Sequence, residues 1–149
     1  MRVAFDLDDT LIPCGLDFPT EAPALPWLAW LLRPEPLRVG TTAALAALRA
    51  DGHELWVYTS SFRSALSVRL TFLCYGLWLD GVINQQRHDA RVGRGGPVKD
   101  PAAFGVDLLF DDSVAVAEAG GGRVVLVAPE AGLAALVEGR ARPTPAPRR

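Results

Sequence analysis

Three apolar stretches of this chain each run into polar residues that a buried segment normally avoids. The stretch "RVAFDL" (2–7) contains Asp6 and runs on into Asp8. The stretch "HELWVYTSS" (53–61) ends on three hydroxyls, and "VDLLFDD" (106–112) ends on two carboxylates. Their apolar and β-branched or aromatic content predicts three buried strands. Carboxylates placed this close together repel one another and lose hydration, so their presence at strand ends requires compensation.

Helical patterns separate these strands. We expect helices over 25–32, 41–52, 62–77, 113–119 and 131–138, short strands over 80–84 and 123–127, and a loop over 85–97. Thr41 or Thr42 is expected to cap the helix over 41–52. The alternation predicts an α/β fold with a Rossmann-like parallel sheet between two helix layers, a three-layer α/β/α sandwich. Ligands of such sheets bind beyond the carboxyl ends of the strands, where the polar residues should meet.

Composition limits the kind of protein. The chain has 149 residues and a net charge of −2, which fits one domain (1–139) and gives no support for nucleic-acid binding. The longest apolar stretch, 24–32, is too short to cross a membrane. Cys14 and Cys74 are expected as free thiols in the cytoplasm. Residues 140–149 are expected to form a disordered basic tail.

A magnesium and phosphate site is the chemistry that these residues favour. Asp6, Asp8, Asp111 and Asp112 would offer oxygen ligands of the kind that Mg²⁺ prefers. Thr59 and Ser60 open a helix, whose first amides attract phosphate, and Lys99, the single lysine beside fourteen arginines, offers a compact positive charge. An exposed acidic rim, with Asp112 and Ser113 capping a helix, is the simpler alternative.

The stretch "FDLDDT" resembles the first motif of the haloacid dehalogenase (HAD) superfamily, a strand that ends in Asp-x-Asp-x-Thr. "ELWVYTSS" is similar to the second motif, Lys99 to the third and "LLFDDS" to the fourth, in the family's order. The resemblance implies that Asp6 is the nucleophile and a Mg²⁺ ligand, and that Asp8 is the general acid and base and lends its carbonyl to the metal. Thr59 and Lys99 would bind the phosphoryl group. Asp111 would bind Mg²⁺ directly and Asp112 through water, with Thr10 and Asp9 in structural roles.

An acid at position 8 is what phosphatases of this superfamily have, so the resemblance implies hydrolysis of a phosphate monoester. The intervals 11–40 and 76–98 are too short to hold a cap domain, and 11–40 is expected to act as a flap or lid. The apolar residues within 24–32 would roof the site, meet a partner or pack on the chain's own core. A second subunit of a homo-oligomer is one such partner.

Several alternatives stay open. A non-catalytic regulatory or binding protein could keep the same fold. Among phosphatases, a nucleotidase and a phosphoprotein or polynucleotide-end phosphatase are not separated. Lys99 lies only twelve residues before Asp111, so Arg63, Arg91 or Arg94 are substitutes for its charge. His53 and His88 are expected to be structural or exposed.

Overall fold

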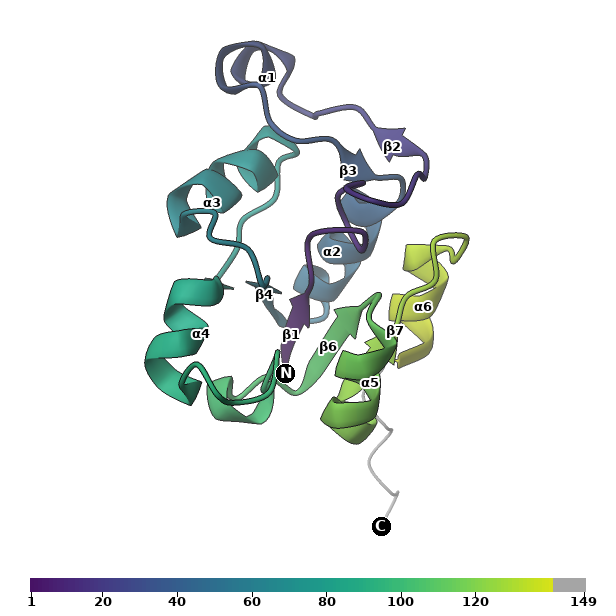
Figure 1. Cartoon of the computed structure of the whole chain (residues 1–149). Helices are drawn as coiled ribbons and strands as arrows, with labels where there is room; N and C mark the ends of the chain where they lie inside the picture. Colours follow the sequence, from purple (N-terminus) through teal and green to yellow (C-terminus); the bar gives the residue numbers. More distant parts are fainter. Residues whose placement is uncertain (141–149) are drawn as a thin grey trace.

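A computed structural model describes residues 1–140 of the chain (Figure 1). Its centre is a five-stranded parallel sheet in the order β5-β4-β1-β6-β7. The strands are β1 (Arg2–Phe5), β4 (Glu54–Tyr58), β5 (Gly81–Ile83), β6 (Leu108–Asp111) and β7 (Val124–Leu126). The predicted α/β fold with a Rossmann-like parallel sheet is therefore confirmed.

The strand order places β1 in the middle of the sheet. The chain passes outward from β1 to β4 and β5, then returns to the other side of β1 with β6 and β7. The parallel register pairs Phe5 with Val57 of β4 and with Phe110 of β6. Such a reversal of direction leaves a crevice at the carboxyl end of the central strand, which is where ligands of doubly wound sheets bind.

Helices connect the strands in the predicted places, with one exception. The elements are α2 (Thr41–Ala50), α3 (Ala65–Cys74), α4 (Gln85–Val92), α5 (Val114–Gly120) and α6 (Leu133–Arg140), with 3₁₀ turns at Ala102–Phe104 and Gly121–Arg123. The predicted loop over 85–97 is wrong for its first half, which forms α4. The Asn84 side chain caps this helix by accepting a hydrogen bond from the amide of Arg87, 3.0 Å away. The sequence of α4 is hydrophilic and shows no apolar helical pattern, because His88 is its single fully buried residue.

The N-terminus of α2 is capped differently from the prediction. Gly40 occupies the cap position, so neither Thr41 nor Thr42 caps the helix with its side chain. Instead the Glu21 carboxylate accepts hydrogen bonds from the Gly40 amide (3.0 Å), the Thr42 amide (2.7 Å) and the Thr42 hydroxyl. An acidic side chain here is favourable because it meets the positive end of the helix dipole.

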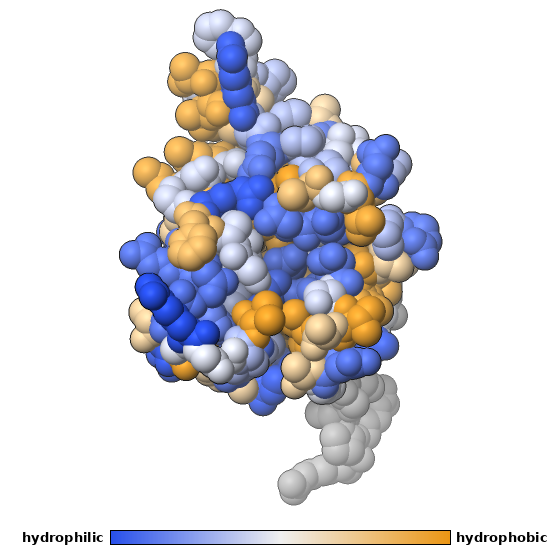
Figure 2. Space-filling view, in the orientation of Figure 1, coloured by the Kyte–Doolittle hydropathy of each residue, from blue (hydrophilic) through white to orange (hydrophobic). Residues whose placement is uncertain are grey.

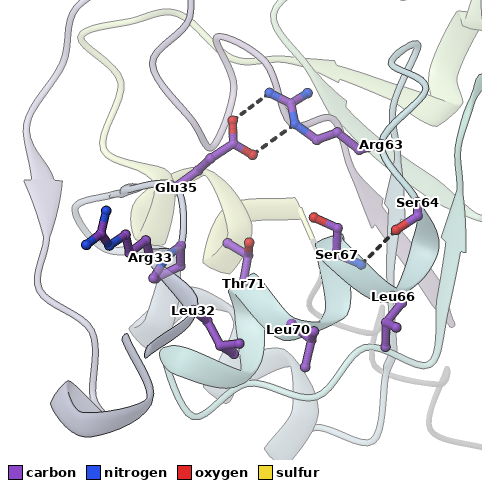
Figure 3. A pocket seen from close by; sticks show the side chains of 10 residues that line it. Leu32, Arg33, Glu35, Arg63, Ser64, Leu66, Ser67, Leu70 and Thr71 are labelled. Carbon is purple, nitrogen blue, oxygen red and sulfur yellow. Dashed lines mark hydrogen bonds and ion pairs between the residues drawn. The ribbon is translucent and has the colours of Figure 1, made fainter. Parts of the chain in front are cut away.

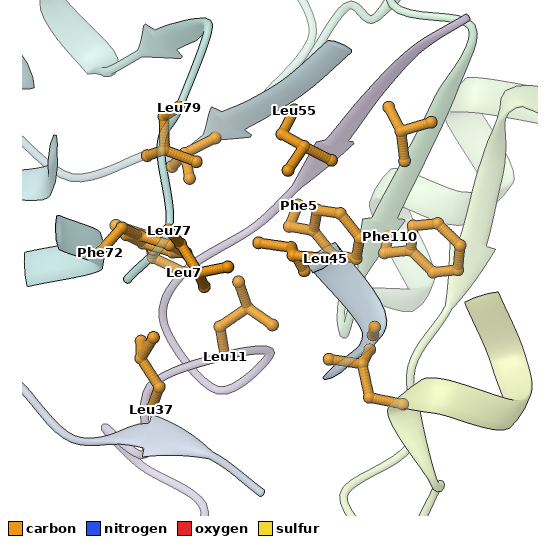
Figure 4. Packing of buried hydrophobic residues seen from close by; sticks show 14 of the residues in the cluster. Phe5, Leu7, Leu11, Leu37, Leu45, Leu55, Phe72, Leu77, Leu79 and Phe110 are labelled. Atoms are coloured by element: carbon orange, nitrogen blue, oxygen red, sulfur yellow. The ribbon is translucent and has the colours of Figure 1, made fainter. Parts of the chain in front are cut away.

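Buried apolar residues form two clusters, and alternate residues of β1 divide between them. Val3 and Phe5 belong to the larger cluster, with residues of α2, α3 and α6, whereas Ala4 belongs to a second cluster with Leu109 and residues of α5. Figure 4 shows part of the larger cluster, in which the stacked rings of Phe5 and Phe110 have centroids 4.9 Å apart. This alternation fixes which face of the sheet each residue after Phe5 and Phe110 can reach.

Residues 11–40 are folded back beside the sheet. They contain a two-stranded antiparallel ribbon, β2 (Thr20–Glu21) and β3 (Leu37–Arg38), and between its strands the helix α1 (Pro26–Leu32), which projects at the top of Figure 1. Leu28 and Ala29 pack against the larger cluster. Trp27 and Trp30 remain 68% and 81% exposed, so α1 packs on the core through one side alone.

The structure also bears on the predictions for the cysteines, for membrane spans and for the C-terminal tail. Cys14 is exposed and Cys74 is buried, and both are free thiols. None of the helices within residues 1–140 combines the length and the apolar character that a membrane span requires. Arg140, expected to begin the tail, is the last residue of α6. The remaining residues of the predicted tail lie outside the part of the chain that the structure describes.

Candidate active site

The acidic residues at the carboxyl ends of β1 and β6 are neighbours. Since Phe5 pairs with Phe110, the next residues, Asp6 and Asp111, lie side by side on the face that carries Ala4 and Leu109. The Asp6 amide donates to the Phe110 carbonyl, 2.8 Å away, and holds this arrangement one residue beyond the strand. On the side of the molecule that Figure 2 shows, hydrophilic residues gather near the centre.

Lys99 joins the two carboxylates. Its Nζ lies 2.6 Å from Asp6 Oδ1 and 2.5 Å from Asp111 Oδ2, and the side chains of Lys99 and Asp111 are 3% and 1% exposed. One ammonium therefore faces two buried carboxylates, which leaves the group one positive charge short. Burial raises the pKa of Asp6 to about 7, with the neighbouring Asp111 adding to the rise and Lys99 opposing it. A cation would relieve this deficit.

A third carboxylate completes a set of metal ligands. One oxygen from each of Asp6, Asp111 and Asp112 lies within 4.8 Å of the other two. Thr10 holds Asp112 in place by donating its hydroxyl to Asp112 Oδ1 at 3.1 Å. The helix cap is Ser113, whose side chain accepts from the Val116 amide, so Asp112 is not used as a cap. An all-oxygen set of this kind fits Mg²⁺.

The position of Lys99 depends on a buried polar network. The Tyr58 hydroxyl accepts a hydrogen bond from the Asp100 amide (2.9 Å) and lies 2.6 Å from Nδ1 of His88. Asp100 Oδ1 in turn accepts from the Ala103 amide at 3.0 Å and starts the 3₁₀ turn. Burial raises the pKa of Tyr58 to about 12, so the hydroxyl stays neutral at physiological pH. His88 is thus structural, as predicted, and His53 is also buried, near the N-terminal amine.

The hydroxyls after β4 border the site on the opposite side of β1. Thr59 is buried, its amide donates to the Ile83 carbonyl (2.9 Å), and its hydroxyl accepts from the Ser61 amide (3.1 Å). Ser60 is exposed. Because β4 is the neighbour of β1, this turn lies beside the carboxyl end of the strand that leads to Asp6.

Asp8 is held apart from the other acids. Arg63 places Nη1 2.9 Å from Asp8 Oδ2 and Nη2 2.9 Å from Asp8 Oδ1, and the Asp8 carboxylate is not among the three clustered acids. The same guanidinium donates to both oxygens of Glu35 at 2.7 and 2.9 Å. These hydrogen bonds, first to Glu35 and then to Asp8, raise the pKa of Arg63. Sequence reasoning named Arg63 as a substitute for Lys99, and it missed Glu35 altogether.

Asp9 has the structural role expected of it. Its φ of +61° lies in the left-handed region, and its Oδ1 accepts from the amides of Cys14, Gly15 and Leu16 at 2.9, 2.7 and 2.7 Å. Burial acts in the opposite direction, yet these three bonds lower the pKa of Asp9. These three hydrogen bonds close the turn between Asp8 and the 11–40 segment.

The other arginines that were considered lie elsewhere. Arg91 donates to the Ala103 carbonyl at 2.5 Å, and Arg94 lies 3.9 Å from the carboxylate of Asp89. Lys99, and neither of these arginines, therefore supplies the cation between Asp6 and Asp111.

Comparison of the sequence with protein-family models and with curated proteins finds no match.

Proposed function

We propose that the protein is a HAD-like, Mg²⁺-dependent phosphatase that hydrolyses a phosphate monoester through an aspartyl-phosphate. The observation that carries this proposal is the contact of Lys99 Nζ with both Asp6 and Asp111, at 2.6 and 2.5 Å, at the carboxyl end of the central strand. Phosphoryl transfer depends mainly on positioning and on neutralising charge, which is what a lysine and a metal ion at a carboxylate cluster provide.

Asp6 is the proposed nucleophile. It is central in the sheet, its Oδ1 is held by Lys99, and Thr59 lies at the end of the neighbouring strand. Asp6, Asp111 and Asp112 would hold Mg²⁺, with the backbone carbonyl of Asp8 as a further ligand. When bound, the ion would neutralise charge on the carboxylates and on the phosphoryl oxygens. Thr59, Ser60 and Lys99 would bind those oxygens.

Asp8 is the proposed general acid and base. An Asp6 oxygen attacks phosphorus, the bond from phosphorus to the ester oxygen breaks, and the departing oxygen takes the proton that Asp8 carries. Water then attacks the aspartyl-phosphate and returns a proton to Asp8. Alcohol and phosphate leave, and both aspartates are restored.

Several features of the fold also support the proposal. The two buried clusters on either side of β1 support a three-layer α/β/α domain over 1–139. The 11–40 segment contains one short helix and a ribbon of two strands with two residues each. This small content supports a HAD-like protein that has a flap and no cap domain. Free Cys14 and Cys74 support a reducing compartment such as the cytoplasm. A homo-oligomer that uses exposed Trp27 and Trp30 remains a proposal.

A non-catalytic binding protein is the competing proposal. The contact of Asp8 with Arg63 favours it, because an acid that donates a proton cannot at the same moment be a carboxylate paired with a guanidinium. Catalysis requires this pair to loosen when substrate binds.

Turnover of p-nitrophenyl phosphate with and without Mg²⁺ tests the proposal. We expect metal-dependent turnover that falls by about 10³-fold or more in Asp6→Asn, because the nucleophile is lost. A matched control is Asp51→Asn, at an exposed position that follows α2. Absence of turnover, together with no thermal shift in Mg²⁺ and beryllofluoride, would favour the binding protein.

A further inference from the structure

A cavity of about 420 Å³ lies beside the candidate active site (Figure 3). Residues 32–35 form one wall and the first two turns of α3, with the two residues before them, form the other. Its lining combines leucines with hydroxyls: Leu32, Leu66, Leu70, Ser64, Ser67 and Thr71. The volume is within the range of pockets that hold small organic ligands.

The wall formed by residues 32–35 is held by residues that flank α3. The hydroxyl of Tyr75, directly after α3, accepts from the Leu37 amide (3.1 Å) and donates to the Glu35 carbonyl (3.4 Å). Glu35 is also held by both hydrogen bonds from Arg63. The cavity is therefore formed before any ligand binds, which lowers the entropy that binding must overcome.

Arg63 connects this cavity to Asp8. Its side chain lines the cavity and also contacts both carboxylate oxygens of Asp8. Asp8 Oδ1 is buried and, among the described residues, accepts no hydrogen bond although it is ion-paired. Asp8 thus lies next to the residue that forms the cavity wall.

The geometry of phosphoryl transfer indicates on which side of the phosphoryl group the leaving group lies. The ester oxygen departs on the side of phosphorus opposite to the attacking Asp6 oxygen, and the proton donor must be within hydrogen-bond reach of it. With Asp8 as donor, the group attached to that oxygen extends towards Arg63. We propose that the cavity between residues 32–35 and α3 binds the leaving group of the substrate, a proposal that rests on the phosphatase function above.

The lining also indicates the chemical class of this leaving group. Arg63 is paired with Asp8 and Glu35, and Arg33, in the 32–35 wall, adds a guanidinium that has no ion pair among the described residues. Most of the remaining lining consists of leucines and hydroxyls, so it favours a group that has both an apolar part and polar atoms. An alcohol that carries an apolar ring would pack on Leu66 and Leu70, and its polar atoms would meet Ser67 and Thr71. The substrate is thus the phosphate monoester of a small alcohol that combines an apolar ring with polar atoms.

Two esters of similar leaving-group basicity test this inference, benzyl phosphate and ethyl phosphate. We expect kcat/KM for the benzyl ester to exceed that for the ethyl ester by about tenfold or more, because the benzyl ring is transferred from water into the cavity. Ser67→Phe, at an exposed position of the lining, fills the cavity and should lower this ratio by about fivefold or more. The control Ala46→Phe, at an exposed position of α2, should leave the ratio unchanged.

Binding is measured separately from turnover. Benzylphosphonate, which is not hydrolysed, is titrated into the ¹⁵N-labelled protein with Mg²⁺, and shifts of the Ser67, Leu70 and Thr71 amides are expected. Asp6-dependent turnover with equal kcat/KM for the two esters would overturn the leaving-group assignment and preserve the phosphatase. An absence of shifts at these amides would overturn the cavity as a binding site. Lack of turnover with every ester would overturn the proposed function, and the leaving-group assignment with it.

Discussion

Replacement of Asp6 by asparagine is expected to remove a loss of stability that the metal-free wild type shows as the pH rises. Burial raises the pKa of Asp6 to about 7 from an ordinary value of 3.8, so the folded protein binds this proton more tightly than the unfolded chain. The stability that the proton contributes is complete below about pH 4 and is lost as the pH rises through about 7. Asparagine has no such proton to lose.

The size of the effect follows from the shift in pKa. Three pKa units, at about 1.36 kcal/mol each, correspond to about 4 kcal/mol over the whole titration. Between pH 5 and pH 8 the unfolded carboxyl is already ionised, so about 2 to 3 kcal/mol of this difference remains. The free energy of unfolding of the wild type should therefore fall by this amount relative to Asp6→Asn over that interval.

Urea unfolding in EDTA, followed by tryptophan fluorescence at pH 5 and pH 8, measures this difference. Titrating groups that do not interact with Asp6 are common to both proteins and cancel in the comparison, provided that the urea m-values agree. Asp51→Asn, at an exposed position, serves as the control and should track the wild type at both pH values. An equal stability difference between Asp6→Asn and the wild type at pH 5 and pH 8 would refute the reasoning, because Asp6 would then not titrate in this range.

Three other predictions concern neighbouring features. Mg²⁺ in excess should raise the melting temperature of the wild type by about 5 °C or more, and Asp111→Asn, which replaces one clustered carboxylate with a neutral amide, should abolish this rise in calorimetry. Tyr58→Phe deprives the Asp100 amide of its buried acceptor and should lower the free energy of unfolding by about 1 to 3 kcal/mol, whereas no change in urea unfolding would show that water replaces the hydroxyl. Asp9→Ala removes the acceptor of three amides, so hydrogen exchange at residues 14–16 should accelerate by about tenfold or more, and unchanged protection would contradict the role of this carboxylate.

Lys99 illustrates how much of the site could be predicted from the sequence. A single lysine among fourteen arginines, before an apolar stretch that ends in two acids, singled it out. Its contacts with Asp6 and Asp111 agree with that expectation. Asp6 and Asp111 meet because parallel strands bring their carboxyl ends to one edge of a sheet. Lys99 reaches them from the segment between α4 and the 3₁₀ turn, so its place depends on tertiary packing.

Arg63 illustrates the opposite case. Its partners Glu35 and Asp8 are separated from it by 28 and 55 residues, and no local pattern links the three. The cavity beside Arg63 arises only when the 32–35 wall folds onto α3. The cap of α2 by Glu21 has the same origin, since a carboxylate 19 residues before Gly40 replaces the local threonines.

The sequence by itself determined the parallel sheet and the convergence of acids, hydroxyls and one lysine at its edge, because strand periodicity and strand-end polarity are local properties. Only the tertiary structure decided which partner each charged side chain has. Ion pairs and cavities form where segments distant in the sequence pack together, and that packing is set by the whole core. The proposed chemistry thus follows from the strand ends, whereas the proposed choice of substrate follows from the fold around Arg63.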